Sequence, residues 1–251
     1  MHSTSALIDM TDAIRARMGV IVSASNRMVE SQLRFCAPAE LAIHVNRMRL
    51  VSRPRKPLSE LTHDVMDAAR MLAAAKVDII VLQASYIAME DGPAGEARLN
   101  RAILEATGTQ SMTSPQAMVE AMRFLGLRRI VIVSPFQQAS NELEKAYLTA
   151  LGFDVLHDLA LGIPDGEPTI AIQPARWVEA TRSAMRPDAD GYFLSGSNTT
   201  IVESIPMIEA AVGKPVVSST QATLWAAIQH LKPKLGAVSV SRPIGQLCER
   251  F

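Results

Sequence analysis

Two short segments of this chain place polar residues at the point where an apolar run ends. Residues 82–85 read LQAS and residues 194–197 read LSGS, at an offset of 112 residues. A second pair, IVS at residues 21–23 and IVS at residues 132–134, recurs at an offset of 111 residues. Serine hydroxyls and backbone N–H groups at strand ends can hold an anionic oxygen. The repeat therefore predicts two similar α/β halves that face each other across a cleft, with these polar residues at one pocket.

The rest of the sequence alternates between apolar runs and segments with helical periodicity. We expect strands at residues 19–23, 41–51, 77–82, 129–133, 153–156, 191–194 and 214–218. We expect helices at residues 58–76, 96–106, 116–125, 141–151, 174–185, 201–212 and 220–230, with another from Asn26 onward. Residues 91–95 and 163–168 are expected to be loops. This alternation is typical of parallel sheets joined by right-handed crossovers.

These elements predict an α/β fold with two pseudo-symmetric lobes. Each lobe is expected to be a four-stranded parallel sheet flanked by helices, with the active-site cleft between the lobes. We place the N-terminal lobe at residues 1–112 and the C-terminal lobe at residues 113–230, and the tail, 231–251, could cross back to the first lobe. Ligands bind at the carboxyl ends of strands in open α/β sheets, so the strand-end loops should converge on one pocket.

Composition favours a globular protein without a nucleic-acid or membrane partner. The chain has 251 residues, 48% of them hydrophobic, and 25 basic residues balance 25 acidic ones. A neutral net charge attracts neither nucleic acid nor an anionic membrane. No apolar run approaches the roughly 18 residues of a membrane-spanning helix, and no signal peptide is apparent. Cys36 and Cys248 are the two cysteines, and their spacing does not fit a metal site. So few cysteines favour a reducing cytoplasm. The sequence contains no nucleotide-binding motif, so we expect no cofactor.

The order and spacing of several short motifs give the chain a family resemblance. They are SASN at 23–26, RMR at 47–49, Met89 with Gly92 and Pro93, SPF at 134–136, LSGSN at 194–198, and PVVSSTQA at 215–222 before Trp225. Together they resemble the aspartate/glutamate racemase superfamily, and within it the maleate isomerase and arylmalonate decarboxylase branch. The resemblance spans nearly the whole chain, and it implies cofactor-independent carbon-acid chemistry on a small carboxylate.

The resemblance also implies one or two cysteines, one in each half, that move protons or attack the substrate. This chain departs from that pattern, because the positions that match the two family cysteines are Ala84 and Gly196. Phe136 stands where the isomerases commonly have a tyrosine, and Gly166 lies near their loop asparagine. Asn26 is the site position that is best preserved. Chemistry with two thiols is therefore not expected.

The candidate site residues lie at these strand ends and in the loops that follow. For catalysis we select Tyr86, Glu90 and Ser197, which supply a phenol, a carboxylate and a hydroxyl. For substrate binding we select Ser25, Asn26, Ala84, Ser85, Phe136, Ser195, Gly196, Asn198 and Thr220. Structural alternatives stay open: the hydroxyl and amide side chains could cap helices, the phenol could pack in the core, and the carboxylate could stay solvated.

The leading functional hypothesis is a cofactor-independent lyase or isomerase that acts on a small mono- or dicarboxylate. Decarboxylation best survives the loss of thiols, because an apolar pocket for one carboxylate and a donor cluster for the other drive CO2 loss without a nucleophile. Two alternatives remain open: a catalytically silent carboxylate-binding or regulatory protein, and a hydrolase or hydratase that uses a bound water. The predicted partner is a small carboxylate, and formation of a homo-oligomer is left open.

Overall fold

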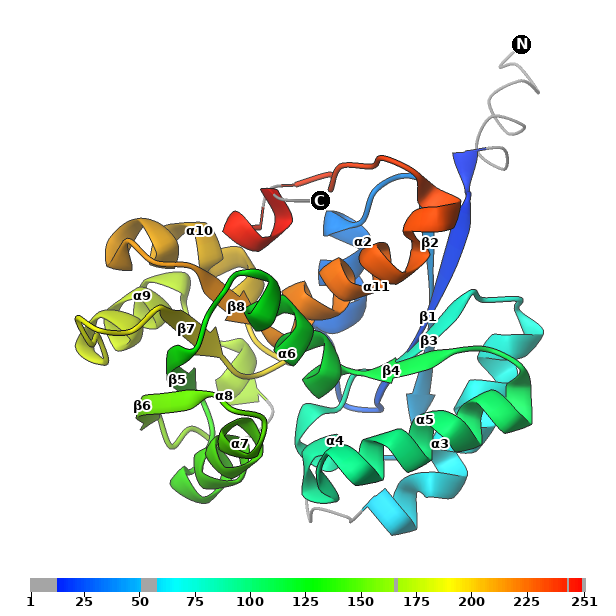
Figure 1. The fold of residues 1–251 in the computed structure, drawn as a ribbon, viewed down its shortest axis with the longest axis horizontal. Coiled ribbons are helices and arrows are strands. Elements are labelled where there is room, and N and C mark those ends of the chain that lie inside the picture. The colour runs from blue at the N-terminus through cyan, green and yellow to red at the C-terminus, as the bar shows by residue number, and fades with distance from the viewer. Residues whose placement is uncertain (1–12, 51–57, 165–166, 243, 250–251) are drawn as a thin grey trace.

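The structure is a computed structural model that describes residues 13–50, 58–164, 167–242 and 244–249. It contains two four-stranded parallel sheets in two lobes that lie side by side (Figure 1). The first sheet has the order β2 (Leu41–Met48), β1 (Ala16–Ser23), β3 (Ile79–Leu82), β4 (Ser111–Thr113). The second has the order β6 (Asp154–Ala160), β5 (Arg129–Ser134), β7 (Gly191–Leu194), β8 (Val216–Ser218). The two orders correspond strand for strand, so the predicted α/β fold is confirmed.

The strands at the centre of each sheet are apolar because helices cover both of their faces. Every residue of β3 and of β7 is buried, as expected for unbroken apolar runs in parallel sheets. Gly191 begins β7 at a point of close approach, where a Cβ atom would lie 2.8 Å from the carbonyl oxygen of Pro215. A larger residue there would push β7 away from the segment that leads into β8.

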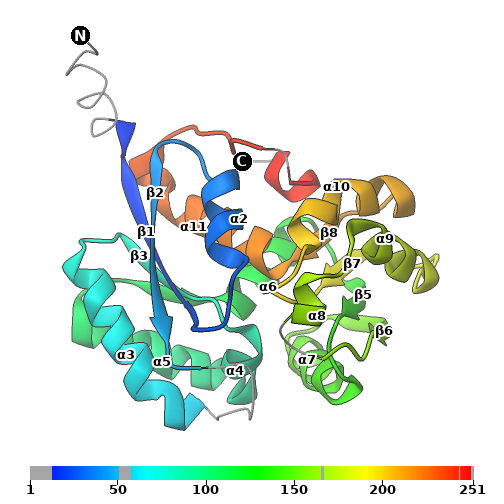
Figure 2. The ribbon, with the colours of Figure 1, turned by 180° about the vertical axis from the view of Figure 1, so that it is seen from behind.

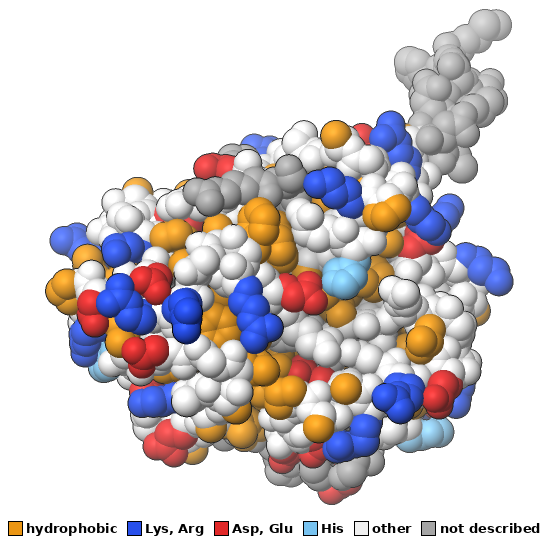
Figure 3. All heavy atoms as spheres, in the orientation of Figure 1, with side chains coloured by type: hydrophobic (Ala, Val, Ile, Leu, Met, Phe, Trp, Pro, Cys, Tyr) orange, Lys and Arg blue, Asp and Glu red, His pale blue; other side chains and the backbone are white. Residues whose placement is uncertain are grey.

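The helices of the first lobe are α2 (Val29–Cys36), α3 (Leu58–Ala74), α4 (Ser85–Glu90), α5 (Gly92–Thr107) and α6 (Ser114–Phe124). Those of the second half are α7 (Gln138–Ala150), α8 (Glu167–Ile170), α9 (Pro174–Ser183), α10 (Ile201–Val212) and α11 (Ser219–Leu235), followed by a short 3-10 helix, η1 (Gln246–Glu249). No helix among the described residues is long and apolar enough to cross a membrane. On the face in Figure 3, basic and acidic side chains are interspersed and hydrophobic side chains gather between the lobes.

The last strand of each sheet leads into a matching helix start. The side chains of Thr113 and Ser218 each accept a hydrogen bond from the backbone N–H three residues on. The side chains at those positions, Gln116 and Gln221, accept a bond from the backbone N–H of the capping residue in return. These capping boxes fix the start of α6 after β4 and of α11 after β8. The pair TSPQ and SSTQ thus extends the internal repeat.

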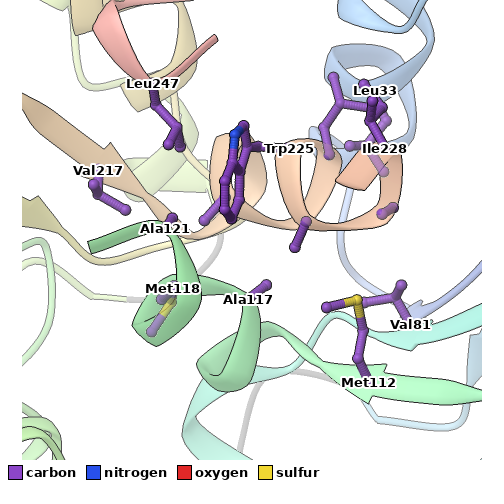
Figure 4. Packing of buried hydrophobic residues seen from close by; sticks show 14 of the residues in the cluster. Leu33, Val81, Met112, Ala117, Met118, Ala121, Val217, Trp225, Ile228 and Leu247 are labelled. Atoms are coloured by element: carbon purple, nitrogen blue, oxygen red, sulfur yellow. The ribbon is translucent and has the colours of Figure 1, made fainter. Parts of the chain in front are cut away.

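Helices α6 and α11 pack against each other between the two sheets (Figure 1). In Figure 4, Trp225 of α11 belongs to the same hydrophobic cluster as Leu247 and Ala121 of α6. The same hydrophobic cluster includes Val81 of β3 and Val217 of β8. A shared core therefore joins the lobes, and the expected division of the chain between residues 112 and 113 stays a prediction.

The segment after α11 passes over α2 and ends in η1 beside α10 (Figures 1 and 2). The backbone N–H of Ser241 donates to the carbonyl of Cys36 at 3.0 Å, and its hydroxyl donates to the carbonyl of Ala37 at 2.6 Å. Further on, the carbonyl of Ile244 accepts a hydrogen bond from the side chain of Gln221 in α11. The segment is thereby fixed to the end of α2 and to the shared core.

Several sequence expectations for the elements were wrong. Residues 91–95 are not a loop, because α5 begins at Gly92 with Pro93 in its first turn. Proline is favoured there, since the N–H that it lacks would have no partner within the helix. Helices α4 and α8 and strand β4 were not expected, and α8 begins at Glu167, inside the expected loop at residues 163–168. Helix α11 continues through Pro233 beyond the predicted end at residue 230. Residue 51 of the expected second strand and Gly166 lie outside the described residues.

Candidate functional site

A cavity of about 160 Å³ lies between the lobes at the carboxyl ends of β1, β5 and β7, and we call it the interlobe cavity. The first lobe lines it with Ser23, Ser25, Asn26 and Leu50, and the second with Phe136, Thr169, Gly196, Ser197, Asn198 and Thr199. None of these described lining residues carries a charged side chain. The cavity therefore offers hydroxyl, amide and backbone groups together with an apolar phenyl ring.

Asn26 belongs to the turn after β1 and is only 3% exposed. Its side-chain oxygen accepts hydrogen bonds from the backbone N–H groups of Met28 at 3.1 Å and Val29 at 3.0 Å. Its side-chain nitrogen donates to Ser197 Oγ at 3.3 Å, across the boundary between the lobes. Asn26 thus satisfies N–H groups at the start of α2, as the structural alternative expected, and also forms part of the cavity wall.

Gly196 gives the second lobe a backbone conformation that favours glycine. Its φ angle is +130°, and side chains rarely occupy this region. A Cβ atom at this position would lie 2.9 Å from Thr199 Cγ2. Thr199 is buried and its hydroxyl donates to the carbonyl of Gly196 at 3.0 Å. A side chain at position 196 would therefore have to displace a fixed neighbour.

Other hydrogen bonds join the lobes beside the cavity. The backbone N–H of Arg27 donates to Asn198 Oδ1 at 2.9 Å. The side-chain nitrogen of Gln32 donates to the carbonyl of Thr199 at 2.8 Å. Together with the bond from Asn26 to Ser197, these contacts hold the loop after β1 against the loop after β7. The same two loops supply most of the cavity lining.

Charged groups surround the cavity without lining it. The guanidinium of Arg47 donates to the carbonyl of Asn26 at 2.6 Å and pairs with Glu30 at 3.2 Å. The guanidinium of Arg47 thus supplies a hydrogen-bond donor to a backbone carbonyl in the turn after β1. Arg27 pairs with Glu167 of α8 at 2.6 Å, and both side chains are exposed.

Ser195 lies at the end of β7 but its side chain is directed away from the cavity. Its hydroxyl donates to the carboxylate of Glu144 in α7, and both residues are 1% exposed. Ser134 at the end of β5 makes an equivalent contact, donating to Asn141 Oδ1 of α7 at 2.5 Å. These bonds attach α7 to the two strand ends. The predicted role of Ser195 in substrate binding stays a prediction.

The end of β3 contributes none of the described residues that line the cavity. Ala84 is half-buried against a hydrophobic cluster of the first lobe. The hydroxyl of Ser85 forms a hydrogen bond with that of Ser114 at 2.8 Å, and Gln83 accepts a bond from Thr223 at 2.5 Å. This strand end therefore faces the start of α6 and α11, and binding roles for Ala84 and Ser85 stay predictions.

Three further candidates lie on helices outside the described cavity lining. Tyr86 is half-buried and Glu90 is exposed, both on α4. Thr220 is 3% exposed in the first turn of α11. Their predicted roles in catalysis and binding also stay predictions.

The two thiols are buried outside the cavity, at the end of α2 and in η1. Burial, with a smaller effect from Glu203, raises the pKa of Cys36 to about 11, and burial is also the main cause that raises the pKa of Cys248. Both side chains are therefore neutral thiols at pH 7, and a thiolate is the reactive form. Among the described residues, no group of three or more His, Cys, Asp and Glu side chains could hold a metal ion.

A buried carboxylate marks a second contact between the lobes. Glu96 of α5 is 1% exposed and accepts hydrogen bonds from the hydroxyl of Thr113 and, at 2.5 Å, from that of Tyr147 in α7. Burial raises the pKa of Glu96, while the two hydrogen bonds oppose that rise. Tyr147 therefore links α7 of the second lobe to α5 of the first.

The structure brings six of the selected residues together around the interlobe cavity: Ser25, Asn26, Phe136, Gly196, Ser197 and Asn198. Four lining residues were not selected: Ser23, Leu50, Thr169 and Thr199. Ser23 and Thr199 belong to the polar segments at the ends of β1 and β7, so the same signal could have found them. Leu50 is an ordinary apolar residue after β2, and Thr169 belongs to the four-residue helix α8, so neither carries a local signal. Polar residues after an apolar run were an informative signal for β1 and β7.

The comparisons with known proteins agree on one family. A family model described as arylmalonate decarboxylase matches residues 18–243. An arylmalonate decarboxylase from Bordetella bronchiseptica is 28% identical over 222 residues, which cover 88% of this chain and 92% of the relative. A maleate isomerase from Pseudomonas putida is 27% identical, covering 86% and 91%. The crystal structure of a maleate isomerase from Pseudomonas putida S16 matches with a TM-score of 0.85 at 25% identity, covering 94% of this chain and 98% of that one.

Proposed function

Because this chain belongs to the arylmalonate decarboxylase family, we propose that it is a lyase that decarboxylates a small dicarboxylate in the interlobe cavity. Relatives named arylmalonate decarboxylase and maleate isomerase support carbon-acid chemistry on a small carboxylate. The absence of a cofactor, a cytoplasmic location and a homo-oligomeric state stay predictions from the sequence.

The observation that carries the proposal is the composition of the cavity walls. Hydroxyl and amide side chains from both lobes line the cavity, and the ring of Phe136 and the side chain of Leu50 supply apolar surface. Neutral donors would hold one carboxylate, while the second lies against apolar atoms that solvate its charge poorly. Loss of CO2 breaks the bond to the second carboxyl carbon. The electron pair of the broken carbon–carbon bond then delocalises into the retained carboxylate, and the donors stabilise the resulting enediolate.

Ser197 is the lining residue best placed to deliver the proton that completes the reaction. Its oxygen accepts a hydrogen bond from Asn26, which leaves its own proton for an oxygen of the substrate or for a bound water. The carbanion carbon takes up a proton, and solvent water restores the proton to the donor. We expect such a hydroxyl to act as an oxyanion donor and as part of a relay with water, since a serine hydroxyl is a weak acid.

The test is incubation of the purified protein with phenylmalonate, alkylmalonates and maleate, with products followed by NMR. We expect CO2 release from at least one malonate, and loss of about a hundredfold or more in kcat for Ser197→Ala. Ser183→Ala is the matched control, because the Ser183 hydroxyl donates to the carbonyl of Ala180 in α9 and does not line the cavity. Folded protein that leaves all these substrates unchanged would contradict the proposal.

A second candidate function is a silent carboxylate-binding protein. It is favoured by one observation: none of the described lining residues has a side chain that titrates near neutral pH. This alternative predicts that a dicarboxylate raises the melting temperature without being consumed. The NMR assay and a thermal shift measured on the same sample separate the two functions.

A further inference from the structure

An ion pair spans the two walls of the interlobe cavity. Arg27 follows Asn26 in the first wall, and Glu167 lies two residues before Thr169 in the second. The Arg27 guanidinium lies 2.6 Å from the Glu167 carboxylate, with 54% and 77% of the two side chains exposed. In Figure 2, helix α8, which begins at Glu167, lies beside the loop that follows β1. The pair therefore joins segments that adjoin the lining of both walls, and both of its side chains are exposed to solvent.

Arg27 is held in place by its backbone while its side chain stays exposed. Its N–H donates to Asn198 Oδ1, which belongs to the opposite wall. The neighbouring guanidinium of Arg47, in contrast, is engaged with the carbonyl of Asn26 and with Glu30. The partner of the Arg27 guanidinium is a carboxylate on a four-residue helix, and an exposed ion pair of this kind contributes little to stability.

We propose that Arg27 is a substrate-binding residue that recruits a carboxylate of the ligand, and that Glu167 is the counter-ion which this carboxylate displaces. The inference rests on the proposed function. The lining side chains are uncharged, so a dianionic ligand needs a cation from the rim of the cavity. A guanidinium can bind a carboxylate through two parallel hydrogen bonds. Exchange of one carboxylate for another costs little, because the number of ion pairs is conserved.

The exchange gives the two partners opposite roles in binding. Arg27 attracts the ligand carboxylate, whereas Glu167 competes with it and repels it. If the ion pair only held the two walls of the cavity together, removing either partner would break the same contact and change ligand affinity in the same direction. The sign of the two effects therefore distinguishes recruitment from a structural role.

The experiment measures malonate binding by isothermal titration calorimetry at low ionic strength. We expect Arg27→Gln to weaken malonate binding roughly tenfold or more, the loss of one charged hydrogen-bonded contact. Glu167→Gln should strengthen binding. Arg34→Gln is the matched control, because Arg34 is also 54% exposed and paired with a carboxylate, that of Glu30, but lies in the last turn of α2, where no neighbouring residue lines the cavity. Acetate, with a single carboxylate for the cavity donors, should be much less sensitive to Arg27→Gln.

The outcomes separate this inference from the proposed function. If wild-type protein binds neither malonate nor phenylmalonate, the carboxylate site itself is wrong and the inference falls with it. If wild type binds malonate but Arg27→Gln and Glu167→Gln shift affinity in the same direction, or by no more than Arg34→Gln, only the role of Arg27 is refuted. Thermal denaturation of each variant checks that these exposed substitutions leave the fold intact.

Discussion

Gly196→Ala tests the geometry of the cavity wall through a single methyl group. The backbone there has φ of +130°, and a residue with a side chain held at such an angle costs about 1–3 kcal/mol. The new Cβ would also lie 2.9 Å from Thr199 Cγ2. Relieving such overpacking in a buried site costs about another 1–3 kcal/mol. We therefore expect Gly196→Ala to lower the free energy of unfolding by about 2–6 kcal/mol.

The assay is urea denaturation at 25 °C, with Gly108→Ala as the matched control. Gly108 has a φ of +69° at the end of α5, and a Cβ there would have no atom within 4 Å. That substitution should cost only the backbone term, about 1–2 kcal/mol. The difference between the two variants then combines the contact with Thr199 and the extra backbone strain at a φ of +130°.

A double-mutant cycle completes the test. Thr199→Ser removes the Cγ2 methyl but keeps the hydroxyl that donates to the Gly196 carbonyl. Alone it should cost about 1 kcal/mol for a lost buried methyl, whereas in the Gly196→Ala background it should be neutral or stabilising. Equal losses for Gly196→Ala and Gly108→Ala, together with additive effects in the cycle, would refute the reasoning.

Two more predictions follow from the described contacts. Ala84→Cys should change the unfolding free energy by no more than about 0.5 kcal/mol, because residue 84 has a φ of −148° that any side chain tolerates. Gly196→Cys should be destabilised at least as much as Gly196→Ala, and a Gly196→Cys variant as stable as Ala84→Cys in urea denaturation would contradict this. Burial raises the pKa of Glu96 above its ordinary value of 4.5. The folded state therefore binds the Glu96 proton more tightly than the unfolded state does. As the pH rises from about 4.5 through the raised pKa, we expect wild type to lose stability relative to Glu96→Gln. Parallel stability curves for wild type and Glu96→Gln between about pH 4 and 8 would show that Glu96 has no raised pKa.

The sequence was most informative where the repeat and the hydrophobic pattern agree. The apolar runs before Ser23, Ser134 and residue 195 correspond to β1, β5 and β7, because parallel strands buried on both faces leave an unbroken apolar signal. Helix α10 was predicted with its observed bounds, since Gly213 ends it in a left-handed conformation. Every strand of the twin sheets except β4 could be predicted from such local signals.

Local signals failed where tertiary contacts decide the structure. Strand β4 has only three residues and forms because it pairs with β3 and leads into the capping box of α6. Gly92 and Pro93 suggested a turn, yet they start a helix whose later residue Glu96 bonds to Thr113 and Tyr147. Such long-range partners cannot be read from neighbouring residues.

The site was predictable only in part, for the same reason. Polar residues at strand ends identified Asn26 and Ser197, which meet across the lobes at 3.3 Å. The same rule selected Ser195 and Ser85, whose hydroxyls instead bond to Glu144 and Ser114. A strand-end position limits where a side chain begins, but its rotamer and partners decide whether it reaches the cavity. The ion pair of Arg27 with Glu167 joins residues 140 positions apart and has no sequence signature.

A crystal structure of the wild-type protein with phenylmalonate tests the central claim most directly. The account predicts a carboxylate of the ligand between the loops after β1 and β7, within hydrogen-bond distance of Asn26 or Ser197, with Arg27 turned from Glu167 toward the ligand. A second pocket is lined by residues of α2 and α10 such as Phe35 and Pro206. Phenylmalonate bound only at another surface, such as this second pocket, with the interlobe cavity unchanged, would contradict the account.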